Sequence, residues 1–147
     1  MQTRNQIEDG YTRAAYIEPV RGLHQGLAFE YRPMLPEEFE DMFAALDKTK
    51  RGRETVAAVA DRIAVKITRW SEVDRKSAQP IKVSASAYSR FGVELFRRVR
   101  GIVQGTEACD LPPGIDDEGL AEFVKAKIAE AHGEPPGGAQ LATDQKN

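Results

Sequence analysis

Near its N-terminus the chain alternates apolar and polar side chains, a pattern that indicates β-strands. Leu27, Phe29 and Tyr31 share one face of such a segment, as expected of a half-buried strand. The preceding segment 11–18 is rich in Tyr, Thr and Ile, and Pro and Gly residues lie between the two, which favours a turn. We therefore predict an antiparallel β-hairpin over residues 11–32. Because an isolated hairpin is only marginally stable in water, it must pack on helices or extend its sheet with another chain.

Beyond the hairpin, apolar residues recur every three or four positions, which is the spacing of amphipathic helices. The pattern predicts four of them, at about 36–47, 54–71, 85–104 and 117–132. The second contains the clearest stripe, formed by Val56, Val59, Ile63, Ile67 and Trp70. Caps are predicted at Ser84 or Ser86, at Asp116 or Asp117, and at Gly105. We interpret Gly92, inside the third helix, as a point of close contact with another helix.

These elements predict an α+β fold that is mostly helical, in which the N-terminal β-hairpin packs on a bundle of about four helices. With 147 residues, the chain has the length of about one domain. We place that domain at 11–132, after a flexible lead at 1–10. Residues 133–147 are rich in Pro, Gly and polar side chains and have little to bury, so we expect a disordered C-terminal tail.

The charge balance, the single cysteine and the lengths of the apolar runs indicate the cellular compartment of the protein. Lys and Arg number 21 against 23 Asp and Glu, for a net charge of −2, which gives no general attraction to nucleic acid or anionic lipid. The single cysteine excludes an intrachain disulfide and fits a reducing compartment. No apolar run approaches the ~20 residues that span a bilayer. We therefore expect a cytoplasmic protein without membrane contact, in the host cytoplasm if a phage encodes it.

Candidate chemistry is sparse in this sequence. His24 and His132 lie apart from each other and from Cys109, so the paired ligands of a zinc site are missing. Cys109 lies next to Asp110 and close to Glu107, whose negative charge disfavours the thiolate. The sequence contains no phosphate-cradling glycine loop. We expect no cofactor, no metal and no enzymatic activity. A competing hypothesis, the third, is a small enzyme whose site is built across a subunit interface.

Basic residues form two clusters, each of which can meet phosphate. They are Lys48, Lys50, Arg51 and Arg53 in a predicted loop, and Arg90, Arg97, Arg98 and Arg100 on a helix flank. We favour a solvated surface with ion pairs to the abundant acidic residues. A nucleic-acid-binding accessory protein is the alternative function, and salt-dependent DNA binding is its test.

The order of the predicted strands, helices and connectors along the chain resembles that of a known protein family. A β segment leads through residues 31–35 (Tyr-Arg-Pro-Met-Leu) into an acidic helix. Residues 67–71 (Ile-Thr-Arg-Trp-Ser) then end the next helix, and a polar connector closes on Pro-Ile at 80–81 before an amphipathic helix at 88–103. Over residues 27–104 this order is similar to small tail assembly chaperones of long-tailed bacteriophages. The hairpin and the last helix are less typical, which leaves room for a related prophage tail protein.

The resemblance implies a non-enzymatic chaperone or adaptor that binds an elongated helical partner, the tape measure protein or another tail protein, during tail morphogenesis. Apolar helix faces can meet an amphipathic partner helix. The hairpin edge can add strands between copies, so we expect a homo-oligomer. The candidate partner-binding residues are Tyr31, Phe39, Phe43 and Trp70, since aromatic side chains are enriched at interfaces, although side chains of this kind are more often core.

Overall fold

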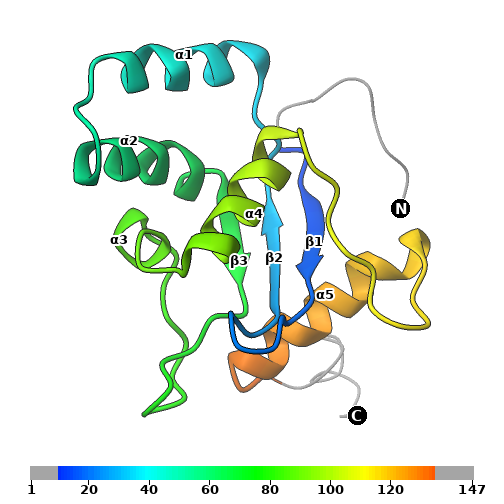
Figure 1. Ribbon diagram of the computed structural model, residues 1–147. Helices are drawn as coiled ribbons and strands as arrows, with labels where there is room; N and C mark the ends of the chain where they lie inside the picture. The colour runs from blue at the N-terminus through cyan, green and yellow to red at the C-terminus, as the bar shows by residue number, and fades with distance from the viewer. Residues whose placement is uncertain (1–9, 135–147) are drawn as a thin grey trace.

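The computed structural model, which describes residues 10–134, has a three-stranded antiparallel sheet with helices against both faces (Figure 1). The strands, in the spatial order β1-β2-β3, are β1 (Arg13–Ile17), β2 (Leu27–Tyr31) and β3 (Ile67–Trp70). The helices are α1 (Pro36–Asp47), α2 (Arg53–Ala64), α3 (Ala85–Tyr88), α4 (Val93–Gln104) and α5 (Asp117–Ala131). The predicted α+β class and the hairpin are confirmed. Residues 1–9 of the predicted lead at 1–10 and residues 135–147 of the predicted tail at 133–147 lie outside the described residues.

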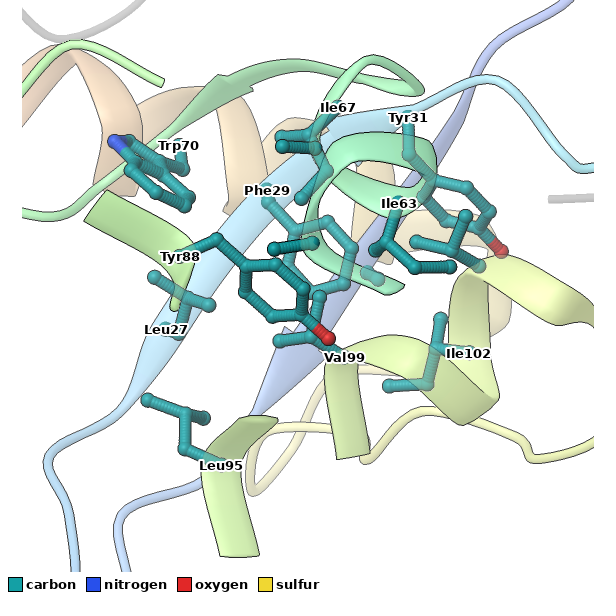
Figure 2. Close-up of a cluster of buried hydrophobic side chains, with 14 of the residues drawn as sticks. Leu27, Phe29, Tyr31, Ile63, Ile67, Trp70, Tyr88, Leu95, Val99 and Ile102 are labelled. Carbon is teal, nitrogen blue, oxygen red and sulfur yellow. The ribbon is translucent and has the colours of Figure 1, made fainter. Parts of the chain in front are cut away.

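Strand alternation divides the core into two parts. Leu27, Phe29 and Tyr31 point to the face covered by α2, α3 and α4, where Figure 2 shows them among the side chains of those helices. Ala14 of β1 and Ala28 of β2 point to the opposite face. Their small size lets α5 lie close to the sheet, where it buries Leu120, Val124 and Ile128.

The predicted helix over 54–71 is wrong after residue 64. α2 ends at Ala64, and the chain then forms β3 beside β2. The Ser71 N–H extends this pairing by donating to the Ala28 carbonyl at 2.9 Å. A third strand gives the hairpin the sheet it needs for stability, and the Ile, Thr and Trp of this segment favour strands. The stripe has helical spacing, but Ile67 and Trp70 are buried as strand residues.

The predicted helix over 85–104 is also wrong as a continuous element. It breaks into α3 and α4, and Gly92 caps the start of α4 in an extended conformation. A Cβ on Gly92 would meet nothing closer than the Leu23 carbonyl oxygen, at 3.9 Å, so this glycine marks no close helix contact. The break leaves the Phe91 ring 5.2 Å from the indole of Trp70. Packing on the sheet therefore outweighs helical continuity here.

Three predicted caps are confirmed. The Ser84 side chain accepts a hydrogen bond from the Ala87 N–H, and the Asp116 side chain accepts one from the Gly119 N–H. Gly105 ends α4 with a φ of +85°, a conformation that favours glycine. The chain turns there into the loop that connects α4 to α5.

Both outer strands of the sheet receive hydrogen bonds from other segments. At β1, the Asp110 N–H donates to the Tyr16 carbonyl at 2.8 Å, and the Glu18 N–H donates to Asp110 Oδ2 at 2.9 Å. At β3, a β-bulge shifts the register against β2, and His132 Nε2 lies 3.2 Å from the Trp70 carbonyl oxygen. Strand addition between copies at these points must displace an existing hydrogen bond.

Candidate partner-binding surface

The four predicted partner-binding residues separate into two groups. Trp70 and Tyr31 are 1% and 4% exposed and belong to the core (Figure 2), and the Trp70 Nε1–H donates to the Ile81 carbonyl at 2.6 Å. Phe39 and Phe43 lie together on α1, with ring centroids 4.8 Å apart in an edge-to-face arrangement. Phe39 is half-buried against the core and Phe43 is 42% exposed. Phe43 is therefore the one of the four that presents a large free surface.

Charged groups join α1 to the end of α2. The Leu35 N–H donates to Glu38 Oε1 at 2.8 Å, and Lys66 Nζ donates to the same carboxylate at 2.9 Å. Desolvation opposes ionisation of Glu38, but these two bonds outweigh it and lower its pKa. Arg62 and Asp41 add a second contact at 3.4 Å. These links hold α1 and α2 as a helical hairpin that stands beside the sheet (Figure 1).

The hairpin carries exposed apolar side chains and a groove. Val56 of α2 is 39% exposed, and Val65, directly after α2, is 73% exposed. A groove of about 410 Å³ runs between α2 and α3, and we call it the α2–α3 groove. Its lining includes Val56, Ala57, Ala60 and Ala85. Small side chains leave room for the larger apolar side chain of another helix.

The predicted basic flank of α4 is occupied by ion pairs. Arg97 contacts Glu94 at 2.7 Å and Glu107 at 3.1 Å, and Arg98 contacts Glu107 at 2.7 Å and Asp110 at 3.0 Å. The hydrogen bond from Arg97 lowers the pKa of Glu94. A phosphate at this flank must compete with these carboxylates for the two guanidinium groups. The ion-pair interpretation is confirmed for Arg97 and Arg98, whereas Arg100 donates to Gln104 and Arg90 is exposed just before α4.

Metal-ligand clusters and membrane-spanning helices are both absent from residues 10–134. Within them no group of three or more His, Cys, Asp and Glu side chains is placed to hold a metal ion. Each helix in this part of the chain is too short or too polar to cross a membrane. Comparisons with protein-family models, curated proteins and solved structures give no match.

Sequence reasoning missed the groove although its signal was present. The alanines of α2 allow close packing against another helix, but their partner α3 lay inside a longer predicted helix. Ala60 is buried at 1% exposure, whereas Ala57 is exposed at the rim. The candidate surface therefore combines the Phe43 side of α1 with the α2–α3 groove.

Proposed function

We propose that the chain is a non-enzymatic assembly chaperone or adaptor that acts in the host cytoplasm. Its partner is an elongated helical protein, the tape measure protein of a long-tailed phage or prophage, which it holds during tail assembly. The observation that carries this proposal is the α1–α2 hairpin, where Phe43 and Val56 expose apolar surface and the α2–α3 groove offers space over small side chains.

The partner class follows from the shape and chemistry of that surface. An amphipathic helix docks through apolar side chains spaced three and four residues apart, which enter a groove between helices. The α2–α3 groove is also lined by Arg53 and Asp61, which provide one basic and one acidic contact. The resemblance of residues 27–104 to tail assembly chaperones supplies the choice of the tape measure protein.

Copurification tests the proposal. The chain is co-expressed with the tape measure protein encoded beside it, and the complex is isolated and sized by light scattering, which also reports self-association. Ala57→Trp fills the α2–α3 groove and Val56→Asp places a charge at its rim. Each substitution should weaken the complex about tenfold, since each costs an interface on the order of 1–2 kcal/mol.

Val93→Asp is the matched control. Val93 is 87% exposed at the first position of α4, where an acidic side chain suits the helix dipole. It lies outside α1 and α2, so its complex should keep the affinity of the unsubstituted chain. A complex that tolerates both groove substitutions, or the absence of any tail gene beside this one, refutes the proposal.

A further inference from the structure

A second cleft lies on the other side of the molecule, between β1, the α4–α5 loop and the start of α5. Its volume is about 570 Å³, within the range of small-molecule sites. Arg13 and Tyr31 line it, and they are direct partners across the β1–β2 ladder. The walls include the apolar side chains of Ile102 and Leu120, and the thiol residue Cys109 also contributes. We call this the Arg13 cleft.

Two polar groups in the Arg13 cleft have no hydrogen-bond partner within residues 10–134. Arg13 Nε is shielded from solvent and has no hydrogen-bond acceptor, and within residues 10–134 its guanidinium forms no ion pair. Tyr31 as a whole is 4% exposed, and its hydroxyl has no hydrogen bond to another described residue. In Figure 2 that hydroxyl points away from the packed cluster. A buried polar atom without a partner is costly, so Arg13 Nε calls for an external acceptor, and the neighbouring Tyr31 hydroxyl can donate to the same acceptor.

The missing partner must be a hydrogen-bond acceptor. A guanidinium can only donate, and burial raises the pKa of Tyr31, although Arg13 opposes this effect, so the phenol keeps its proton and donates as well. Two converging donors, one of them cationic, select an anion.

The charge of the surroundings selects the class of anion. Asp117 and Glu107 also line the cleft. Glu107 is engaged by Arg97 and Arg98, at 3.1 Å and 2.7 Å, but both carboxylates still oppose a doubly charged phosphate more than a singly charged group. A planar carboxylate also matches the fork of a guanidinium.

We propose that the Arg13 cleft binds a small carboxylic acid in its ionised form. The carboxylate accepts hydrogen bonds from Arg13 and from the Tyr31 hydroxyl, and the apolar body of the ligand lies against Ile102 and Leu120. This proposal is independent of the partner-binding surface, because neither α1 nor α2 contributes to the cleft.

The test uses the full chain and simple probes. Hexanoate and benzoate are titrated in parallel with their neutral amides and with inorganic phosphate, and binding is followed by backbone amide NMR shifts. As a second readout, the single cysteine, Cys109, is modified with a neutral thiol reagent. A bound carboxylate should shift signals around the cleft and slow this modification several-fold, whereas amides should do neither.

Substitutions assign the effect to named groups. Arg13→Gln should weaken binding about tenfold or more and Tyr31→Phe about threefold, the range expected for hydrogen bonds to a charged group. Arg90→Gln removes the same charge from an exposed site and should leave binding unchanged. Thermal unfolding of each variant verifies that it is folded. Equal binding by Arg13→Gln, no carboxylate binding at about 10 mM, or a preference for phosphate overturns the proposal.

Discussion

Replacing Trp70 with Phe should lower the free energy of unfolding by about 2–4 kcal/mol. The indole is 1% exposed, and its Nε1–H donates to the Ile81 carbonyl at 2.6 Å, which ties the connector between β3 and α3 to the sheet. Loss of that donor leaves a carbonyl without its partner, at a cost of about 1–3 kcal/mol. The smaller ring also leaves a void beside Phe91, which adds about 1 kcal/mol.

Urea unfolding followed by circular dichroism measures this loss, and the melting temperature should fall by roughly 10 °C. Val93→Ala, at a site that is 87% exposed, is the control and should change stability by less than about 0.5 kcal/mol. The unsubstituted chain has one tryptophan, so iodide quenching reports directly on its accessibility. A Trp70→Phe protein with full stability but weakened partner capture would show that Trp70 is an interface anchor, and the core assignment would fail.

Three further substitutions test the fold. Gly105→Ala should lower the free energy of unfolding by about 1 kcal/mol because the φ of Gly105 is +85°. Gly92→Ser should raise it by about 0.5 kcal/mol, because the backbone there is extended, has open space around it and lets the serine cap α4. Thermal melts compare the two variants. Glu107→Gln removes the partner of two arginines and should cost about 1–2 kcal/mol in urea unfolding, with a smaller loss at high salt. The pKa of Glu38 is lowered from 4.5 in the folded state, so its contribution to stability is present above about pH 4.5 and disappears as the pH falls through that lowered pKa. Glu38→Gln should therefore flatten the dependence of stability on pH in this acid range. Urea unfolding at stepped pH measures this.

Elements with local signals were predictable from the sequence. The Pro36 start of α1, the Asp116 cap of α5 and the alternation around Phe29 each act within a few residues. The local signal of β3 is ambiguous, because Ile67 and Trp70 fit a helical stripe as well as a strand until β2 is available to pair with them. Strand formation there depends on a contact with residues nearly 40 positions earlier, as the Glu30–Arg69 pairing shows, and sequence periodicity does not contain that contact.

The candidate sites also depend on long-range contacts that the sequence pattern does not contain. Aromatic character alone selected Phe43 and Tyr31 together, but only the tertiary structure separates the exposed ring from the buried one. The Arg13 cleft was not predictable. Arg13 and Tyr31 are neighbours across the hairpin, and Cys109 joins them from a loop far along the chain. No spacing within a short stretch of sequence therefore indicates that these residues line the same cleft.

The hydrogen bonds at the margins of the sheet have a consequence for crowded solutions. The Asp110 N–H donates to the Tyr16 carbonyl at the margin of β1, and the His132 ring lies at the Trp70 carbonyl at the margin of β3. Open strand margins are where folded proteins begin cross-β aggregation, and bulges and covering segments suppress it. We therefore expect these contacts to disfavour strand addition between copies at the Tyr16 and Trp70 carbonyls.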